Sequence, residues 1–131
     1  QFDIEYMKRL FDRCGLTYYG CCEPLDKKID ILREFKNLRR ISITPWADAD
    51  IAADAMKDKY VLSAKSNPAY VSQPIFDPEP VIEETKKILL ACKRNNTPCE
   101  FILKDISTIN KNVTHLTKWV KTVSQTIDRY W

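Results

Sequence analysis

Residues 40–64 read RISITPWADADIAADAMKDKYVLSA and contain one strand–helix–strand unit. The short apolar runs at 40–44 and 60–64 have the length and composition of buried β-strands. Between them, a helix is predicted from about Asp48. Its apolar face consists of Ile51, Ala52, Ala55 and Met56. Two strands joined by a helix return to the same end of a sheet and therefore run parallel.

The same unit is repeated on both sides of this segment. A helix at 4–14 comes first, and Thr and Tyr residues favour a strand at 16–21. After the strand at 60–64 comes a long loop, and Asp77-Pro78 then marks the start of a helix. Another strand is predicted at 99–103. The helical stripes that follow the strands are Leu25, Ile29, Leu32 and Phe35; Val81, Thr85, Ile88, Leu89 and Cys92; and Leu116, Trp119, Val120, Val123, Ile127 and Tyr130.

Four consecutive strand–helix units after an N-terminal helix predict an α/β fold with a parallel sheet. The strands begin about 28 residues apart on average, close to the roughly 31 residues that a (β/α)8 barrel of about 250 residues gives to each unit. We therefore expect residues 1–131 to form a single partial domain, the C-terminal half of a TIM barrel. An open sheet of flavodoxin type is the alternative, although no glycine-rich phosphate loop supports a nucleotide-binding version of it.

Charge and cysteine content narrow the class of protein. The formal net charge is +3, and Lys/Arg and Asp/Glu residues are interspersed along the chain, which argues against a nucleic-acid partner. No apolar run approaches the roughly 18 residues of a membrane span, and no signal peptide is recognisable. Five cysteines, two of them adjacent, cannot form a complete set of disulfides within one chain. These features predict a cytoplasmic protein without membrane contact.

The chain opens at Gln1, without an initiator methionine and already inside a predicted helix. We therefore expect an N-terminal half-barrel upstream in a longer parent protein, and we expect the fragment alone to be inactive. A half-barrel would have two open sheet edges and an inner face of apolar side chains. Such a fragment is expected to form a homo-oligomer, a dimer that completes a barrel-like or continuous sheet, or else to close as a small open α/β sandwich.

The four strand-to-helix junctions are the expected functional region, because the active site of a barrel lies at the carboxyl ends of its strands. The junctions read YYGCCEP at 18–24, TPWAD at 44–48, SAKSNPA at 63–69 and LKDIST at 103–108. This concentration of polar residues is more than packing requires.

The first junction carries the expected metal ligands. If the extended chain continues past the strand, Tyr19, Cys21 and Glu23 project to one side, since side chains alternate along a strand. Cys21 and Glu23 would then converge, and a thiolate and a carboxylate can both bind zinc. The alternative is that Cys21 and Cys22 fill tight space near the sheet, as free cysteines often do.

Two residues of the later junctions are the expected catalytic groups. Lys65 follows a buried strand and precedes a rigid Asn-Pro turn, so its ammonium is available for a carboxylate, a phosphate or a nearby acid. The alternative is an ordinary surface lysine. Lys104 and Asp105 should point to opposite sides of their strand end, so only one of them can enter the mouth. We expect Asp105 to be that residue, although an Asp here can also cap a turn.

Three further residues are the expected substrate contacts, namely Tyr19, Trp46 and Asn67. Trp46 could line a planar ligand, although a tryptophan beside a helix start commonly packs instead. Asn67 lies beside Lys65 at the turn after the third strand.

Four ordered segments of the chain resemble the C-terminal part of bacterial proteins of the uroporphyrinogen decarboxylase-like superfamily. The segments are YGCCEPL at 19–25, ISITPWAD at 41–48, YVLSAKSNPA at 60–69 and EFILKDIST at 100–108. The resemblance extends from residue 16 to about 120, and it is more specific for the superfamily than for a substrate. It implies a (β/α)8 barrel. The superfamily includes tetrapyrrole decarboxylases and zinc-dependent enzymes that move methyl groups between corrinoid proteins and thiols.

The zinc motif of those methyltransferases, His-x-Cys, would fall on Tyr19-Gly20-Cys21. Tyrosine replaces histidine here, Glu23 is a possible substitute ligand, and no cysteine follows Cys99. The family's standard zinc set is therefore incomplete. The resemblance still implies a fragment of a methyltransferase-like parent, with zinc assistance and a corrinoid protein as partner. The alternatives are decarboxylation of uroporphyrinogen or another tetrapyrrole, and a non-catalytic tetrapyrrole-binding domain.

Overall fold

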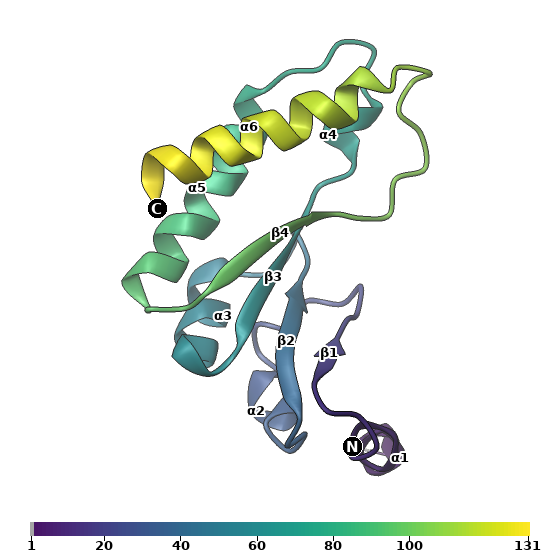
Figure 1. Cartoon of the computed structure of the whole chain (residues 1–131), viewed down its shortest axis with the longest axis vertical. Helices are drawn as coiled ribbons and strands as arrows, with labels where there is room; N and C mark the ends of the chain where they lie inside the picture. The colour runs from purple at the N-terminus through teal and green to yellow at the C-terminus, as the bar shows by residue number, and fades with distance from the viewer. Residues whose placement is uncertain (1) are drawn as a thin grey trace.

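A computed structural model of the chain describes residues 2–131, with side chains from residue 4 onward. The chain has an α/β fold with one four-stranded sheet, and every strand pair is parallel (Figure 1). The strands lie in chain order: β1 (Thr17–Tyr19), β2 (Leu38–Ile43), β3 (Val61–Ser66) and β4 (Cys99–Leu103). Each of the four expected strands is confirmed, although β1 is only three residues long.

The helices are α1 (Phe2–Phe11), α2 (Ile29–Leu32), α3 (Ala49–Met56), α4 (Ala69–Ser72), α5 (Glu79–Arg94) and α6 (Thr114–Tyr130), with a 3-10 turn η1 (Lys57–Lys59) before β3. Two of them start where the sequence predicts. Asp48 Oδ1 accepts the amide hydrogens of Asp50 and Ile51 at the start of α3, and Asp77 Oδ1 accepts that of Glu79 at the start of α5. The stripe at 25–35 forms only the single turn α2, but its apolar residues are still buried.

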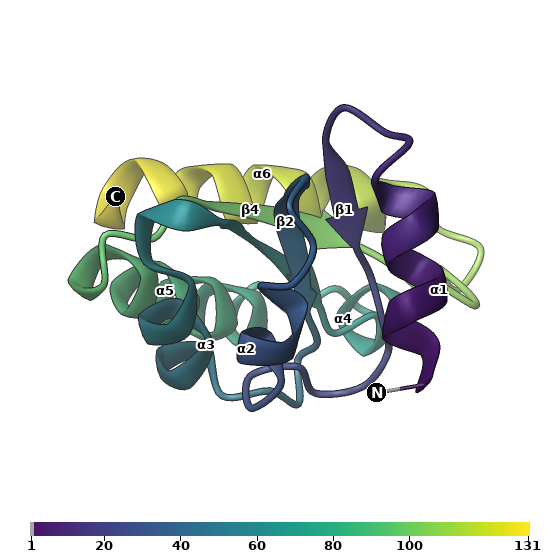
Figure 2. The same cartoon turned by 90° about the horizontal axis from the view of Figure 1, so that it is seen from below.

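The strand order explains why α2, α3, α4 and α5 lie on the same side of the sheet (Figure 2). A crossover between parallel strands is right-handed in nearly all proteins. When each crossover steps to the next strand in the same direction, each helix is brought to the same face. A flavodoxin-type sheet reverses direction and therefore has a different strand order. The sequential order β1-β2-β3-β4 is not of that type.

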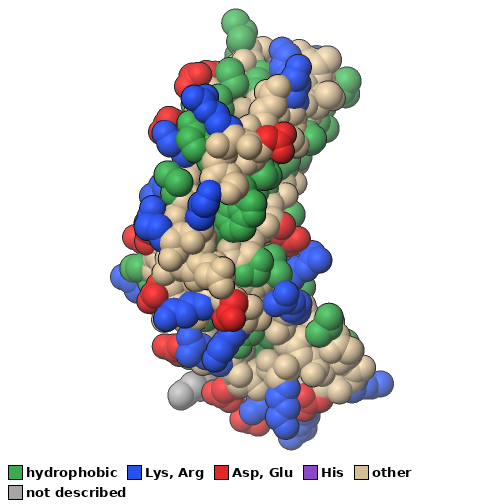
Figure 3. Space-filling view, turned by 60° about the vertical axis from the view of Figure 1, so that its left-hand side comes forward, with side chains coloured by type: hydrophobic (Ala, Val, Ile, Leu, Met, Phe, Trp, Pro, Cys, Tyr) green, Lys and Arg blue, Asp and Glu red, His purple; other side chains and the backbone are tan. Residues whose placement is uncertain are grey.

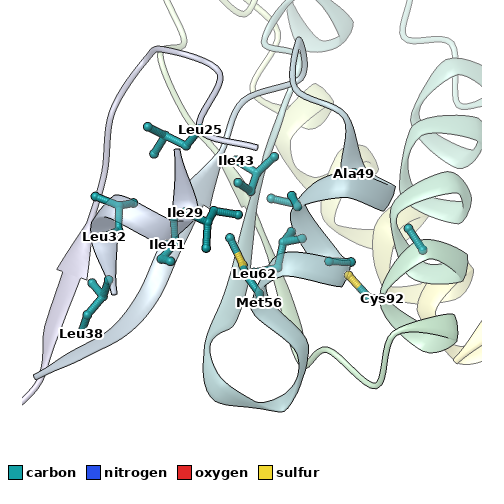
Figure 4. Packing of buried hydrophobic residues seen from close by; sticks show 14 of the residues in the cluster. Leu25, Ile29, Leu32, Leu38, Ile41, Ile43, Ala49, Met56, Leu62 and Cys92 are labelled. Atoms are coloured by element: carbon teal, nitrogen blue, oxygen red, sulfur yellow. The ribbon is translucent and has the colours of Figure 1, made fainter. Parts of the chain in front are cut away.

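Two apolar clusters attach the helices to the sheet. The larger joins β2 and β3 to α2, α3 and α5, and its members in Figure 4 include Leu25, Ile29, Leu32, Leu38, Ile41, Ile43, Ala49, Met56, Leu62 and Cys92. The smaller joins α6 to α4 and α5 through Val71, Phe76, Val81, Trp119 and Val123. The core therefore lies between the sheet and the helices.

The other face of the sheet is polar, and none of the described helices lies over it. The strand positions that alternate with the core residues are Tyr18, Arg40, Ser42, Val61, Ser63, Lys65, Glu100 and Ile102, of which Val61 and Ile102 are aliphatic. Arg40 and Glu100 form an ion pair of 2.9 Å across β3, and the Tyr18 hydroxyl donates to Ser63 Oγ. The face is therefore largely polar and not uniformly apolar as expected, although Val61 and Ile102 belong to it.

The surface that comes forward in Figure 3 shows Lys/Arg and Asp/Glu side chains intermixed, without a large patch of one sign. Among residues 2–131, no helix combines the length and the apolar character needed to cross a membrane.

The position of the core makes Leu62 a sensitive site for a substitution. Leu62 is fully buried in β3, so Leu62→Ala should lower the free energy of unfolding by about 2 to 5 kcal/mol in urea denaturation. The same substitution at Leu16, which is 76% exposed, is the control and should change stability by less than about 0.5 kcal/mol. Equal losses in the two variants would contradict the packing described here.

Candidate functional site

A buried lysine marks the carboxyl end of β3. Lys65 is 4% exposed and belongs to the polar face of the sheet. Its Nζ donates to the backbone carbonyl of Cys21 at 2.6 Å. The loop that follows β1 therefore passes over the amine and holds it in place.

A second lysine reaches the same place from β4. Lys104 is the first residue after β4, and its amine is near enough to that of Lys65 for each lysine to shift the pKa of the other. Its other contacts are Cys22 Sγ at 3.7 Å and Asp105 Oδ2 at 3.4 Å. Three strand ends thus contribute to one cluster, the lysine cluster, which consists of Cys22, Lys65, Lys104 and Asp105.

The two lysines have opposite pKa shifts. Burial lowers the pKa of Lys65 from its usual value, and the hydrogen bond and charge of Lys104 lower it further. The hydrogen bond with Lys65 is the main reason that the pKa of Lys104 is raised. A pair of ammonium groups at this distance repels itself. The arrangement therefore makes Lys65 the more easily deprotonated of the two amines.

At the first junction, Tyr19 and Cys21 lie on the same side of the chain as expected, whereas the Glu23 carboxylate has a lysine partner. The extended chain ends at Tyr19, whose ring stacks on Phe35 in the core on the helix side. Cys21 packs against the same core, and its Sγ accepts the backbone N–H of Glu23 at 3.2 Å. The exposed Glu23 carboxylate pairs with Lys28, and that hydrogen bond and charge lower the pKa of Glu23. The regular strand ends at Tyr19, so it does not carry the alternation as far as Glu23.

The remaining expected residues are divided between the cluster and its surroundings. Asp105 does reach the cluster, through Lys104, but Lys104 and not Asp105 contacts Lys65. Asp105 has a φ of 60°, so the strand geometry on which the expectation relied has ended. Trp46 is 71% exposed. The Asn67 side chain accepts the amide hydrogen of Ala69 at 3.0 Å, which is a local role at the start of α4.

Sequence reasoning missed a partly buried carboxylate beside the end of β3. Glu84 of α5 accepts the Ser66 hydroxyl at 2.8 Å and the backbone N–H of Asn67 at 3.3 Å. Burial raises the pKa of Glu84, although its hydrogen bonds oppose the shift. Glu84 also lines a small cavity together with Thr44, whose buried hydroxyl has no partner among the described residues. This group fixes the β3–α4 turn from the helix side of the sheet.

The residues present do not fit a zinc ion. The described part of the chain holds no group of three or more His, Cys, Asp or Glu side chains that could bind a metal. Cys21 Sγ accepts a backbone N–H, and Cys22 lies beside the Lys104 ammonium. A cation at this position would disfavour a divalent metal.

The chain matches no protein-family model, no curated protein and no solved structure. The resemblance to the uroporphyrinogen decarboxylase-like superfamily therefore stays a prediction.

The pKa of Glu84 leads to a test of its burial. In the folded protein this carboxyl holds its proton to higher pH than in the unfolded chain, so stability should fall as pH rises from the ordinary Glu pKa through the raised one. Glu84→Gln keeps the hydrogen-bonding capacity without the charge. It should raise the urea midpoint at pH 7 and have little effect at acid pH. Glu83→Gln on the exposed side of α5 is the matched control, and an identical pH profile for the two variants would contradict the assignment.

Proposed function

We propose that this chain is half of a (β/α)8 barrel of the uroporphyrinogen decarboxylase-like type. Three observations support the proposal. The strands follow one another in chain order, the helices that cover the sheet lie on one face of it, and the other face carries polar side chains. In a closed barrel the polar face would be the interior, and the strand ends with Lys65 and Lys104 would be part of the mouth.

We infer that this mouth binds the carboxylate groups of a tetrapyrrole. The observation that carries the inference is the lysine pair, which presents amine hydrogens and one retained positive charge at the end of the sheet. A carboxylate placed between two lysines would favour the charged form of both, because an opposite charge relieves their repulsion. The cluster therefore supports tetrapyrrole binding or decarboxylation.

Methyl transfer involving a corrinoid protein is the weaker candidate. It relies on the sequence resemblance, and the described donor atoms do not supply a zinc site for it. The five cysteines are all unpaired, which is compatible with the cytoplasmic location that we propose.

We also propose that the sheet is completed by another chain. With β1 and β4 at the two edges, each has backbone groups available for pairing, as edge strands generally do. The natural partner is the N-terminal half-barrel of a longer parent, and a second copy of this chain can substitute for it. The chain alone should therefore form a dimer in light scattering, with a mass that increases with protein concentration. A constant monomer mass over the whole concentration range would contradict this partner.

Binding of uroporphyrin, a stable tetrapyrrole with several carboxylates, tests the proposed function. The Soret band of the porphyrin should shift when the chain is added, and Lys104→Glu should weaken binding about tenfold, or about 1.4 kcal/mol. Binding should also weaken with salt, because part of the attraction is between exposed charges.

Lys59→Glu is the charge-matched control, since Lys59 is exposed on η1 before the start of β3. It should bind uroporphyrin as well as the unchanged chain. If both substitutions weaken uroporphyrin binding equally, the effect comes from net charge alone. The proposed carboxylate-binding mouth then loses its support. Stoichiometric zinc binding that is lost in Cys21→Ser would instead support the methyltransferase candidate.

A further inference from the structure

The strongest unexplained feature is that two lysines meet beneath a loop. Lys65 is almost entirely buried, and one hydrogen bond to the Cys21 carbonyl would be enough to hold it. That bond does not explain why the Lys104 amine lies near the Lys65 amine, because two neighbouring ammonium groups would destabilise the fold. Asp105 Oδ2 at 3.4 Å balances part of the Lys104 charge, and an uncharged Lys65 or a bound anion would relieve the remaining repulsion.

We propose that Lys65 is a nucleophilic amine that forms an imine with the carbonyl group of a 2-oxo acid, and that Lys104 binds the adjacent carboxylate. The geometry supplies both requirements. The Lys65 amine is held at a strand end with its direction fixed by Cys21. The Lys104 ammonium is beside it, and its side chain is 39% exposed, so an anionic group can approach from solvent.

The chemistry balances without an additional reagent. The lone pair of Lys65 Nζ attacks the carbonyl carbon, and the carbonyl oxygen takes up a proton to give a carbinolamine. Loss of water from that adduct forms the C=N bond, so amine and oxo acid give imine and one water molecule. The Lys104 ammonium can donate the proton to the departing hydroxyl and recover it from the nitrogen or from solvent. The protonated imine can then accept electrons from the substrate, as in other lysine-dependent enzymes.

The electrostatics of the site agree with this geometry. A lysine becomes nucleophilic when it is desolvated or placed beside another cation, since both effects increase its free-amine fraction at neutral pH. Lys65 has both conditions, and its pKa is lowered accordingly. Cys22 and Asp105 oppose the shift through their charges, but they are smaller influences.

The position beneath the surface is compatible with access. Cys22 and Asp105, the other members of the lysine cluster, are exposed. Lys65 itself is 4% exposed, so a three-carbon acid has to approach it from the side of these exposed residues.

Reductive trapping tests the proposal on the chain as it is. Pyruvate and sodium cyanoborohydride at pH 7 should convert the imine into a stable secondary amine, and peptide mapping by mass spectrometry should locate it. We expect Lys65 to be labelled before the exposed lysines, by about tenfold for each unit by which its pKa is lowered. Labelling in proportion to exposure would overturn the proposal, because Lys65 would then react least.

The role of Lys104 requires a separate comparison. Methyl pyruvate has the same carbonyl group without the negative charge, so the unchanged chain should prefer pyruvate. Lys104→Met should abolish this preference and also slow the labelling of Lys65, because the neighbouring charge is lost. Lys104→Arg should retain the preference, and Lys59→Met should behave as the unchanged chain. A preference that survives in Lys104→Met would assign the carboxylate to another residue and overturn that part of the proposal.

This inference goes beyond the proposed function and does not depend on it. If pyruvate binds at the lysine pair but cyanoborohydride traps no adduct on Lys65, the pair binds anions only. That result would overturn imine formation while supporting a carboxylate-binding mouth. A trapped adduct on Lys65 in a chain that does not bind uroporphyrin would support imine formation and contradict the proposed binding of a tetrapyrrole.

Discussion

The parallel pairing of four strands in chain order is the constraint on which the rest of this molecule depends. Because each right-handed crossover moves one strand further in the same direction, the helices between strands accumulate on one face. Apolar side chains such as Ile41 and Leu62 must therefore point to that face. The alternate positions are left for side chains that tolerate water, and a charged pair such as Arg40–Glu100 can form there. Core and polar face are two consequences of one topology.

The same constraint brings Lys65 and Lys104 together. β3 and β4 are adjacent and parallel, with Lys65 paired to Ile102. Residues at the carboxyl ends of these strands consequently lie side by side although 39 residues separate them along the chain. The loop after β1 adds the carbonyl of Cys21 from two strands away. Lys65 is buried by this convergence and not by the hydrophobic core.

Sequence patterns predicted the fold class well, because core-facing residues recur at every second position in a strand and at every third or fourth position in a helix. They also placed Lys65 near the end of a strand, although its expected catalytic role stays a prediction. The patterns failed where the regular backbone ends. Tyr19 is the last residue of β1, so no alternation connects it to Glu23, and the positive φ of Asp105 changes its direction. No sequence pattern pointed to Glu84, because a partly buried glutamate on a helix cannot be told from an exposed one by residue type.

The polar face also limits how the sheet can be completed. An apolar inner face would drive association through burial of area, but here association must cover Arg40 and Glu100, which already neutralise each other. Taking such a pair out of water costs more than its mutual attraction returns unless additional hydrogen bonds compensate. Pairing through the backbone of an edge strand avoids most of that cost, because it adds hydrogen bonds at β1 or β4 and leaves Arg40 and Glu100 paired with each other. A completed sheet would then retain a hydrated mouth above Lys65, which is the environment that both a carboxylate and a small oxo acid need in order to enter.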